Sequence, residues 1–349
     1  MTDILNDENE IRQYTFSEIQ KSFAHHYQNC HLYRQFCDLH QFTPPQLTCF
    51  ADLYNIPQIP TAIFKSLAVC SVDQETCKCC TSSGTKGYVS RIYRDGRTIR
   101  AFLDSIVRDL DSMYGLTPEN CIIYNLGPSE EEAGDIWIAY VTGFLKHAFE
   151  TYQYMHAGIL ETARFIQDLQ AHPAEKRIVL LGAPILFMKV FEYMERSGTV
   201  LHLPESALIF TAGGWKSKIG EALPRDVLCA KFDRYFGTGQ TQYFDVYNQV
   251  ESNTPFFECR CGGRHVPAGY LVIARDPVTL KELPDSEEGV ISFLDSSANS
   301  YPAFVITDDI GSVTTGCRCG YKGQVFHYGR RVKSVESKGC AIKLDQKIV

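Results

Sequence analysis

Residues 81–87 form a Thr-Ser-Ser-Gly-Thr-Lys-Gly run whose side chains suit phosphate chemistry. Its two glycines permit backbone conformations that other residues avoid, so successive N–H groups can turn inward around an anion. The hydroxyl groups add hydrogen-bond donors, and Lys86 adds a positive charge. The run lacks the GxxxxGK[ST] pattern, so it does not predict a Walker-type NTPase. Taken by itself, it fits either a phosphate-binding loop or a polar hairpin loop.

Two CxC pairs, each followed by glycine, predict a structural zinc site. Zinc in such sites takes four tetrahedral sulfur or nitrogen ligands. The sequence offers five candidates, and two ligand sets remain open. One is the all-thiolate set, and the other replaces Cys261 with the nearby imidazole of His265. The candidates are Cys259, Cys261, His265, Cys317 and Cys319. The competing interpretation is two unrelated thiol pairs in loops.

Acidic residues at two expected strand ends could bind a nucleotide or its metal ion. Glu251 follows a predicted strand beside polar residues, and Asp308 and Asp309 follow another strand after Thr307. A carboxylate can hold Mg²⁺ alongside substrate phosphates. An aspartate at a strand end can accept hydrogen bonds from ribose hydroxyls. Each acid taken alone is more typical of a turn or cap residue than of a ligand site, and Arg330 by itself fits a solvated turn.

Predicted strands and helices alternate over residues 121–225. The strands are 121–125, 177–182 and 207–211, and the helices include 162–169, 184–196 and 216–223. This alternation predicts βαβ units and a mainly parallel sheet. Ligands of such sheets bind at the carboxyl ends of the strands, where Gly127, Gly182 and Gly213 fall.

The flanking regions have a different pattern. Residues 16–40 predict one amphipathic helix, because apolar side chains recur there at helical spacing, and residues 98–115 predict another. From 268 to 315, short apolar runs alternate with turns, which predicts an antiparallel, barrel-like subdomain.

Composition excludes several classes of protein. The 349-residue chain carries a net charge of −7 and has no long run of basic residues, so we expect no nucleic-acid partner. It has no apolar window long enough for a membrane span and no signal peptide. The 14 cysteines therefore indicate thiols and a cytoplasmic protein.

The order of these motifs resembles the adenylate-forming superfamily. The order is TSSGTKG, AGGW, YNQVE, TDDIG and GRR, and it covers most of residues 50–345. Within the superfamily the chain is most similar to the acyl-protein synthetases, the long-chain fatty acid–luciferin component ligases, which are short relatives of phenylacetate–CoA ligases. Supporting features are the paired CxC segments and Lys338-Gly339-Cys340.

The resemblance implies a role for each motif. Ser82, Ser83, Gly84, Thr85, Lys86 and Gly87 would cradle the ATP phosphates. Gly213 and Gly214 would line the adenine and acyl pocket, and Tyr247 and Asn248 would flank the adenylate. Glu251 would hold Mg²⁺, Asp309 would bind the ribose hydroxyls, and Arg330 would contact ribose or phosphate at a hinge. Cys340 would accept the acyl group as a thioester.

The resemblance also implies an α/β fold and an activity. Residues 1–328 would form the large domain of an adenylate-forming enzyme, and 329–349 a hinge and a truncated C-terminal tail. The adenylating lysine of full-length relatives has no clear counterpart; Lys338 and Lys343 are candidates. The implied reaction uses ATP and Mg²⁺ to activate a carboxylic acid, possibly a fatty acid, and passes it to a thiol, with an acyl-carrier or reductase protein as partner. The alternatives are an acyl- or aryl-CoA ligase and a weakly active subunit of a multienzyme complex.

Overall fold

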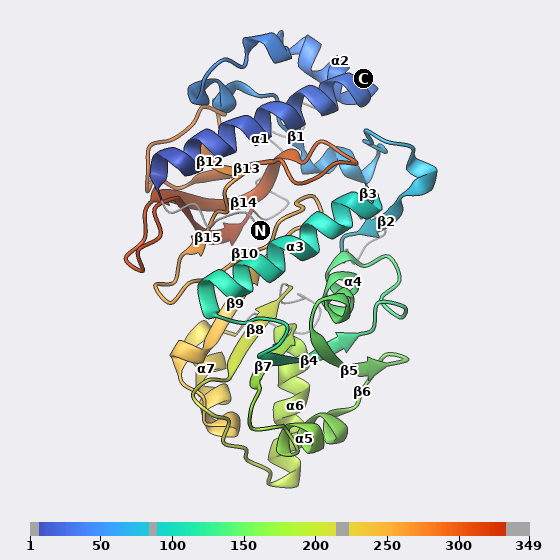
Figure 1. The fold of residues 1–349 in the computed structure, drawn as a ribbon, viewed down its shortest axis with the longest axis vertical. Coiled ribbons are helices and arrows are strands. Elements are labelled where there is room, and N and C mark those ends of the chain that lie inside the picture. The colour runs from blue at the N-terminus through green and yellow to red at the C-terminus, as the bar shows by residue number, and fades with distance from the viewer. Residues whose placement is uncertain (1–6, 84–88, 214–222, 333–349) are drawn as a thin grey trace. The chain divides into compact units, whose positions relative to one another are not determined.

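The computed structural model describes residues 7–83, 89–213 and 223–332. The chain forms two compact units (Figure 1). Unit 1 combines residues 1–102 with 249–349, and unit 2 comprises residues 103–248. Nearly all of the helix predicted at 216–223 lies outside the described residues.

Unit 2 is built on a sheet whose strands lie in the order β9-β8-β7-β4-β5-β6. The strands are β4 (Cys121–Pro128), β5 (Glu150–His156), β6 (Ile159–Leu160), β7 (Arg177–Gly182), β8 (Leu208–Ala212) and β9 (Tyr243–Tyr247). Every neighbouring pair is parallel except β5 and β6. The predicted parallel sheet is therefore confirmed, and β7 has the predicted bounds.

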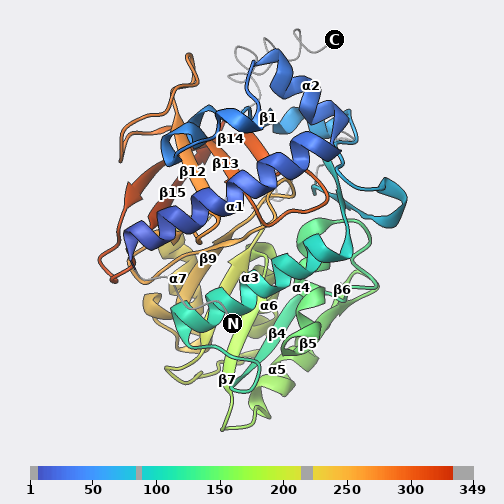
Figure 2. The same ribbon diagram turned by 45° about the horizontal axis from the view of Figure 1, so that its top comes forward.

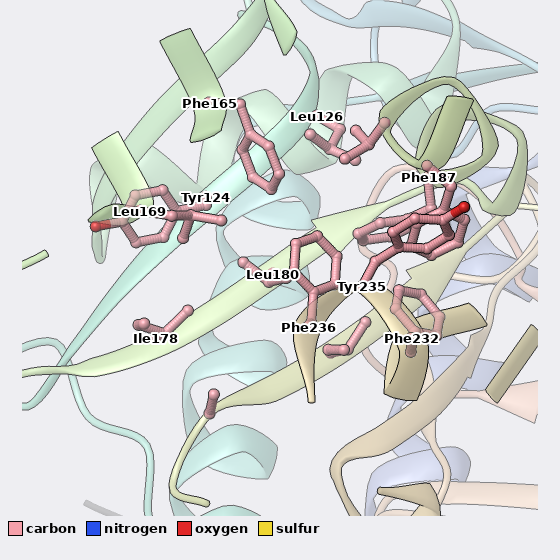
Figure 3. Packing of buried hydrophobic residues seen from close by; sticks show 14 of the residues in the cluster. Tyr124, Leu126, Phe165, Leu169, Ile178, Leu180, Phe187, Phe232, Tyr235 and Phe236 are labelled. Carbon is pink, nitrogen blue, oxygen red and sulfur yellow. The ribbon is translucent and has the colours of Figure 1, made fainter. Parts of the chain in front are cut away.

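Helices cover both faces of this sheet. They are the second half of α3 (Gly96–Tyr114), α4 (Trp137–Phe144), α5 (Thr162–Gln170), α6 (Pro184–Ser197) and α7 (Arg225–Phe236). Figure 3 shows Phe165, Phe187 and Phe232, from α5, α6 and α7, packed over the sheet residues Tyr124 and Leu180. Because side chains alternate along a strand, β8 also presents Phe210 to the other face. There the ring of Tyr114, the last residue of α3, lies 5.0 Å from that of Phe210.

Local chemistry explains the ends of these elements. Helix α6 begins with Pro184 at its first turn, where a missing N–H costs nothing. It ends at Gly198, whose φ of 67° is a left-handed conformation that glycine adopts readily. Strands β4, β7 and β8 are almost wholly buried, which explains their continuous apolar runs.

Unit 1 contains a six-stranded sheet. Its strands β11 (Arg264–His265), β15 (Gln324–Arg331), β14 (Phe304–Thr315), β13 (Gly289–Asp295) and β12 (Tyr270–Arg275) are antiparallel neighbours in that order. Strand β1 (Ile59–Pro60) pairs in parallel with β14. Strands β2 (Lys78–Thr81) and β3 (Arg91–Arg94) form a separate hairpin, and β10 is Phe256–Phe257. The antiparallel arrangement predicted after residue 268 is confirmed.

The single helix predicted for residues 16–40 is wrong. The structure has α1 (Glu8–Asn29) and α2 (His31–Leu39), with Cys30 in an extended conformation between them. The rings of Phe23 and Tyr33 lie 6.4 and 6.0 Å from that of Phe304 on β14. A straight helix would separate two residues ten positions apart by about 15 Å along its axis, so one ring could not contact both. Figure 2 shows α1 lying along this sheet.

Two predictions about the whole chain bear on its class. The described cysteines are all free thiols, as expected from the sequence. Within the described ranges, no helix is both long and apolar enough to cross a membrane.

Candidate active site

The predicted phosphate loop connects β2 and β3 in unit 1. Two hydrogen bonds between Ser82 and Ser90 close the base of this loop. The backbone N–H of Ser82 donates to the carbonyl of Ser90 at 3.2 Å, and the Ser82 hydroxyl accepts from the N–H of Ser90 at 3.1 Å. Ser83 is exposed just beyond this closure. Residues Gly84, Thr85, Lys86 and Gly87 lie outside the described residues.

Glu251 is a buried acid of unit 1, with 7% of its surface exposed. Burial raises the pKa of Glu251 above its ordinary value, although a hydrogen bond from Ser90 and the charges of Arg331 and Lys65 favour the carboxylate. The base of the phosphate loop therefore contacts the predicted metal-binding acid. A carboxylate beside a hydroxyl offers the oxygen ligands that Mg²⁺ prefers, so this donor set fits that ion.

Asp309 lies on β14 and is 3% exposed, whereas Asp308 is half-buried. The side-chain amide of Gln249 donates to Asp309 Oδ2, and the N–H of Asp309 donates to Thr307 Oγ1 at 3.0 Å. Arg331 Nε lies 3.8 Å from Asp309 Oδ1. Arg330, the residue named from the sequence, is exposed on β15 opposite Ile310. The guanidinium beside the predicted ribose-binding acid is thus that of Arg331.

Unit 2 carries the predicted adenine and adenylate positions at the carboxyl ends of two strands. Gly213 follows β8 with φ of 88°, a conformation that favours glycine. Tyr247 ends β9, and Asn248 Oδ1 accepts a 2.9 Å hydrogen bond from the indole N–H of Trp137. The Trp137 ring also stacks on Tyr140, with centroids 6.2 Å apart. Gly214 lies outside the described residues.

One of the two open zinc ligand sets is assembled in unit 1. Cys259, His265, Cys317 and Cys319 each offer one ligand atom, and these atoms all lie within 4.8 Å of one another. His265 Nε2 lies 3.1 Å from Cys319 Sγ, and Cys259 Sγ lies 3.6 Å from Cys317 Sγ. Cys261 is not a member of this group among the described residues. Among the described residues, the four side chains of the set with one histidine therefore lie together.

Each CxC pair occupies a tight turn. The N–H of Gly262 donates to Cys259 O at 2.8 Å, and that of Gly320 donates to Cys317 O at 2.9 Å. Both glycines have positive φ, 83° and 101°, which explains the glycine after each pair. The N–H of Cys261 donates to Cys259 Sγ at 3.4 Å, a contact that favours a thiolate. These turns hold the sulfur atoms of Cys259, Cys317 and Cys319 within 4.8 Å of one another.

Two residues beside the predicted ones were not assigned a role from the sequence. Ser90 contacts Glu251, and Arg331 lies beside Asp309. Ser90 had a usable signal, because it lies two residues before the buried Ile92 and so shares the buried face of its strand. Cys340, Lys338 and Lys343 lie outside the described residues.

Comparison with known proteins identifies the family. The model of the family described as "Acyl-protein synthetase, LuxE" matches residues 5–349. A long-chain-fatty-acid–luciferin-component ligase of Vibrio harveyi is 32% identical over 345 residues, which cover 97% of this chain and 89% of that protein. A ligase of the same name from Aliivibrio fischeri is 31% identical over 330 residues, 93% of this chain and 86% of that one.

A solved structure shows the same fold at much lower sequence identity. A 2-hydroxyisobutyryl-CoA ligase in complex with 2-HIB-AMP and CoA matches with a TM-score of 0.72 at 13% identity, covering 94% of this chain and 69% of that one. This likeness confirms the predicted fold of an adenylate-forming large domain. The chain belongs to the acyl-protein synthetase family, which confirms both the family and the class of AMP-forming acid–thiol ligase that the sequence predicted.

Proposed function

We propose that this chain joins a fatty acid to a protein thiol in two steps. In the first, a carboxylate oxygen attacks the α-phosphorus of ATP, and pyrophosphate leaves. In the second, a thiolate attacks the acyl carbon of the adenylate, and AMP leaves. The observation that carries this proposal is the family match over residues 5–349. The names of the relatives support a long-chain fatty acid as substrate. We further propose a reductase or acyl-carrier protein as partner.

In unit 1, we assign the phosphate groups of ATP to the loop at residues 82–87 and Mg²⁺ to Glu251. When bound there, Mg²⁺ supplies charge neutralisation on the phosphates. The contact between Glu251 and Ser90, at the base of the loop, supports this assignment. Asp309 is assigned to the ribose hydroxyls because its carboxylate is buried, and Arg330 to ribose or phosphate at a hinge preceding the tail.

In unit 2, we assign Gly213 and Gly214 to the adenine and acyl pocket, and Tyr247 and Asn248 to the adenylate. The positive φ of Gly213 at a strand end supports this role, because glycine lets a backbone approach a ligand closely. We further propose that residues 1–328 act as the large domain and 329–349 as hinge and tail. The enzyme would act in the cytoplasm, where an acceptor cysteine stays reduced.

Exchange of labelled pyrophosphate into ATP tests the first step directly. We expect exchange only when a suitable acid is present, with long-chain fatty acids the most effective of a panel. Absence of exchange with every acid would contradict the proposal. A product that appears only with coenzyme A, without labelled protein, would instead support an acyl-CoA ligase.

We also propose that Cys259, His265, Cys317 and Cys319 hold a structural Zn²⁺. Three thiols and one imidazole within 4.8 Å match the ligand number and type that zinc takes in structural sites. His265 lies on β11, and Cys317 and Cys319 lie between β14 and β15. The ion would thus link β11 to the turn between β14 and β15.

Removing the zinc is expected to destabilise unit 1. Treatment with a strong chelator should release about one equivalent of zinc and lower the melting temperature by about 5–10 °C, because a few kcal/mol of binding energy is lost. His265→Ala should reproduce this loss, whereas Cys261→Ala should retain the metal. Metal analysis and thermal unfolding measure both effects. Equal zinc content in the protein with and without His265 would rule out the histidine as a ligand.

A further inference from the structure

Arg94 is a fully buried arginine in β3, the strand that follows the phosphate loop. Its guanidinium contacts one short segment. Nη2 donates to the carbonyl of Val250 at 2.5 Å and to that of Ser252 at 3.0 Å, and Nε donates to Asn253 Oδ1 at 3.1 Å. These acceptors lie on both sides of Glu251. All of them belong to unit 1.

Tyr301 extends this set of contacts to Glu251 itself. Arg94 Nη2 donates to the Tyr301 hydroxyl at 3.0 Å, and that hydroxyl donates to the carbonyl of Glu251 at 3.3 Å. Burial raises the pKa of Tyr301 well above its ordinary value, so the hydroxyl keeps its proton and remains a donor. Three consecutive carbonyls, those of residues 250–252, therefore accept hydrogen bonds from the Arg94–Tyr301 pair.

The buried residues on the side of β3 that carries Arg94 also include one that closes the phosphate loop. Ser90, Ile92 and Arg94 alternate along the chain and are each at most 1% exposed, so all three point inward. Ser90 closes the loop and hydrogen-bonds to the Glu251 side chain. Arg94, four residues on, donates to the carbonyls of Val250 and Ser252, on either side of Glu251. The inward-facing residues of segment 90–94 thus reach both the side chain and the flanking backbone of the acid.

The chemistry of this position requires arginine. A planar guanidinium presents several N–H groups in fixed directions, whereas a lysine ammonium has three donors on a flexible stem. A buried cation is costly unless its donors are satisfied and a counter-charge is near. Asp295 is also buried, and its Oδ2 accepts from the N–H of Asn253 at 2.8 Å. Burial raises the pKa of Asp295, and the positive charge of Arg94 acts in the opposite direction, in favour of the carboxylate. Arg94 therefore serves more than packing.

We propose that Arg94 is a positioning residue that fixes the direction of the Glu251 carboxylate relative to the base of the phosphate loop. The inference rests on the proposed function, in which Glu251 binds the metal of the nucleotide complex. It assigns to Arg94 no contact with ATP or Mg²⁺. Its effect is to hold the acid in place, so that the metal does not have to organise it on binding.

Binding of Mn²⁺, a paramagnetic substitute for Mg²⁺, tests the inference without relying on turnover. The dissociation constant is measured by electron paramagnetic resonance with a non-hydrolysable ATP analogue present. Arg94→Lys is expected to weaken Mn²⁺ binding by about 10- to 100-fold, as loss of a residue that orients a metal ligand usually does. Tyr301→Phe keeps the buried ring and removes one hydroxyl, and should weaken binding by about two- to tenfold.

Arg275→Lys provides the matched control. Arg275 is also buried in unit 1 and also has four hydrogen-bonding partners, namely Gln58, Ser292, Leu280 O and Tyr54 O. We expect this variant to melt at a lower temperature while its Mn²⁺ affinity stays that of the unaltered protein. If Arg94→Lys does not fold, Tyr301→Phe alone decides the matter. Unaltered affinity in Tyr301→Phe, or equal losses in the Arg94 and Arg275 variants, would overturn the inference.

Glu251→Gln separates this inference from the function on which it rests. If that variant loses Mn²⁺ affinity while the Arg94 and Tyr301 variants retain it, only the positioning role of Arg94 is wrong. If Glu251→Gln binds Mn²⁺ normally, the assignment of the metal to Glu251 is wrong, and the inference fails with it.

Discussion

Replacing Glu251 with glutamine is expected to lower the rate of ATP–pyrophosphate exchange by about 10²–10³-fold. The substitution preserves size and removes one negative charge, so several kcal/mol of metal-mediated charge stabilisation is lost, and each 1.36 kcal/mol changes a rate tenfold. Glu251 is buried, and a hydrogen bond from Ser90 favours its carboxylate form. Exchange at saturating fatty acid and ATP measures the effect.

Glu258→Gln is the matched control for this prediction. Glu258 is a second buried glutamate of unit 1, 6% exposed, seven positions along the chain. Its substitution removes the same charge from a similar depth and should leave the exchange rate close to that of the unaltered enzyme. Comparable rates in the two variants would show that the loss reflects buried charge in general and not a role of Glu251 in the reaction.

The fold of unit 2 could be predicted from sequence where apolar runs end in glycine. Strand β7 has the bounds expected for Arg177–Gly182, because a fully buried parallel strand needs a continuous apolar run. Strand β5 escaped prediction because its residues, Glu150–His156, are mostly half-buried or exposed and form no such run. The break at Cys30 escaped because it accompanies contacts of both helices with Phe304, which is remote in sequence.

The types of residue in the candidate site could be predicted from the sequence, but the contacts between them could not. The order of motifs led to Glu251 and Asp309, and both are buried. The residues around these acids come from distant parts of the chain: Arg94 lies 156 residues from Val250, the neighbour of Glu251, and Arg331 on β15 lies beside Asp309 on β14. The choice between Cys261 and His265 likewise depended on the turn. The N–H of Cys259 donates to Gly263 O, and β11 then brings His265 beside Cys319.

Cys340→Ser is expected to abolish the labelled acyl-protein that forms from ATP and a radiolabelled fatty acid, while exchange of pyrophosphate into ATP continues. Adenylation precedes transfer and needs no thiol, whereas a thioester requires a thiolate as nucleophile. Several described cysteines are poor acceptors, because burial raises the pKa of Cys37 to about 12 and that of Cys121 to about 11. Label that neutral hydroxylamine removes identifies the thioester in the unaltered protein.

The control for this result is Cys49→Ser, because Cys49 is an exposed thiol outside the proposed zinc site. A fatty acyl group activated as its adenylate could react by chance with any accessible thiol. The Cys49 variant measures how much label arises from such a chance reaction at one exposed cysteine. We expect Cys49→Ser to retain full labelling. Undiminished labelling in Cys340→Ser would exclude Cys340 as the acceptor, and a similar partial loss in both variants would point to acyl transfer without a dedicated cysteine. Loss in Cys340→Ser alone requires that one thiol near the C-terminus receives the acyl group.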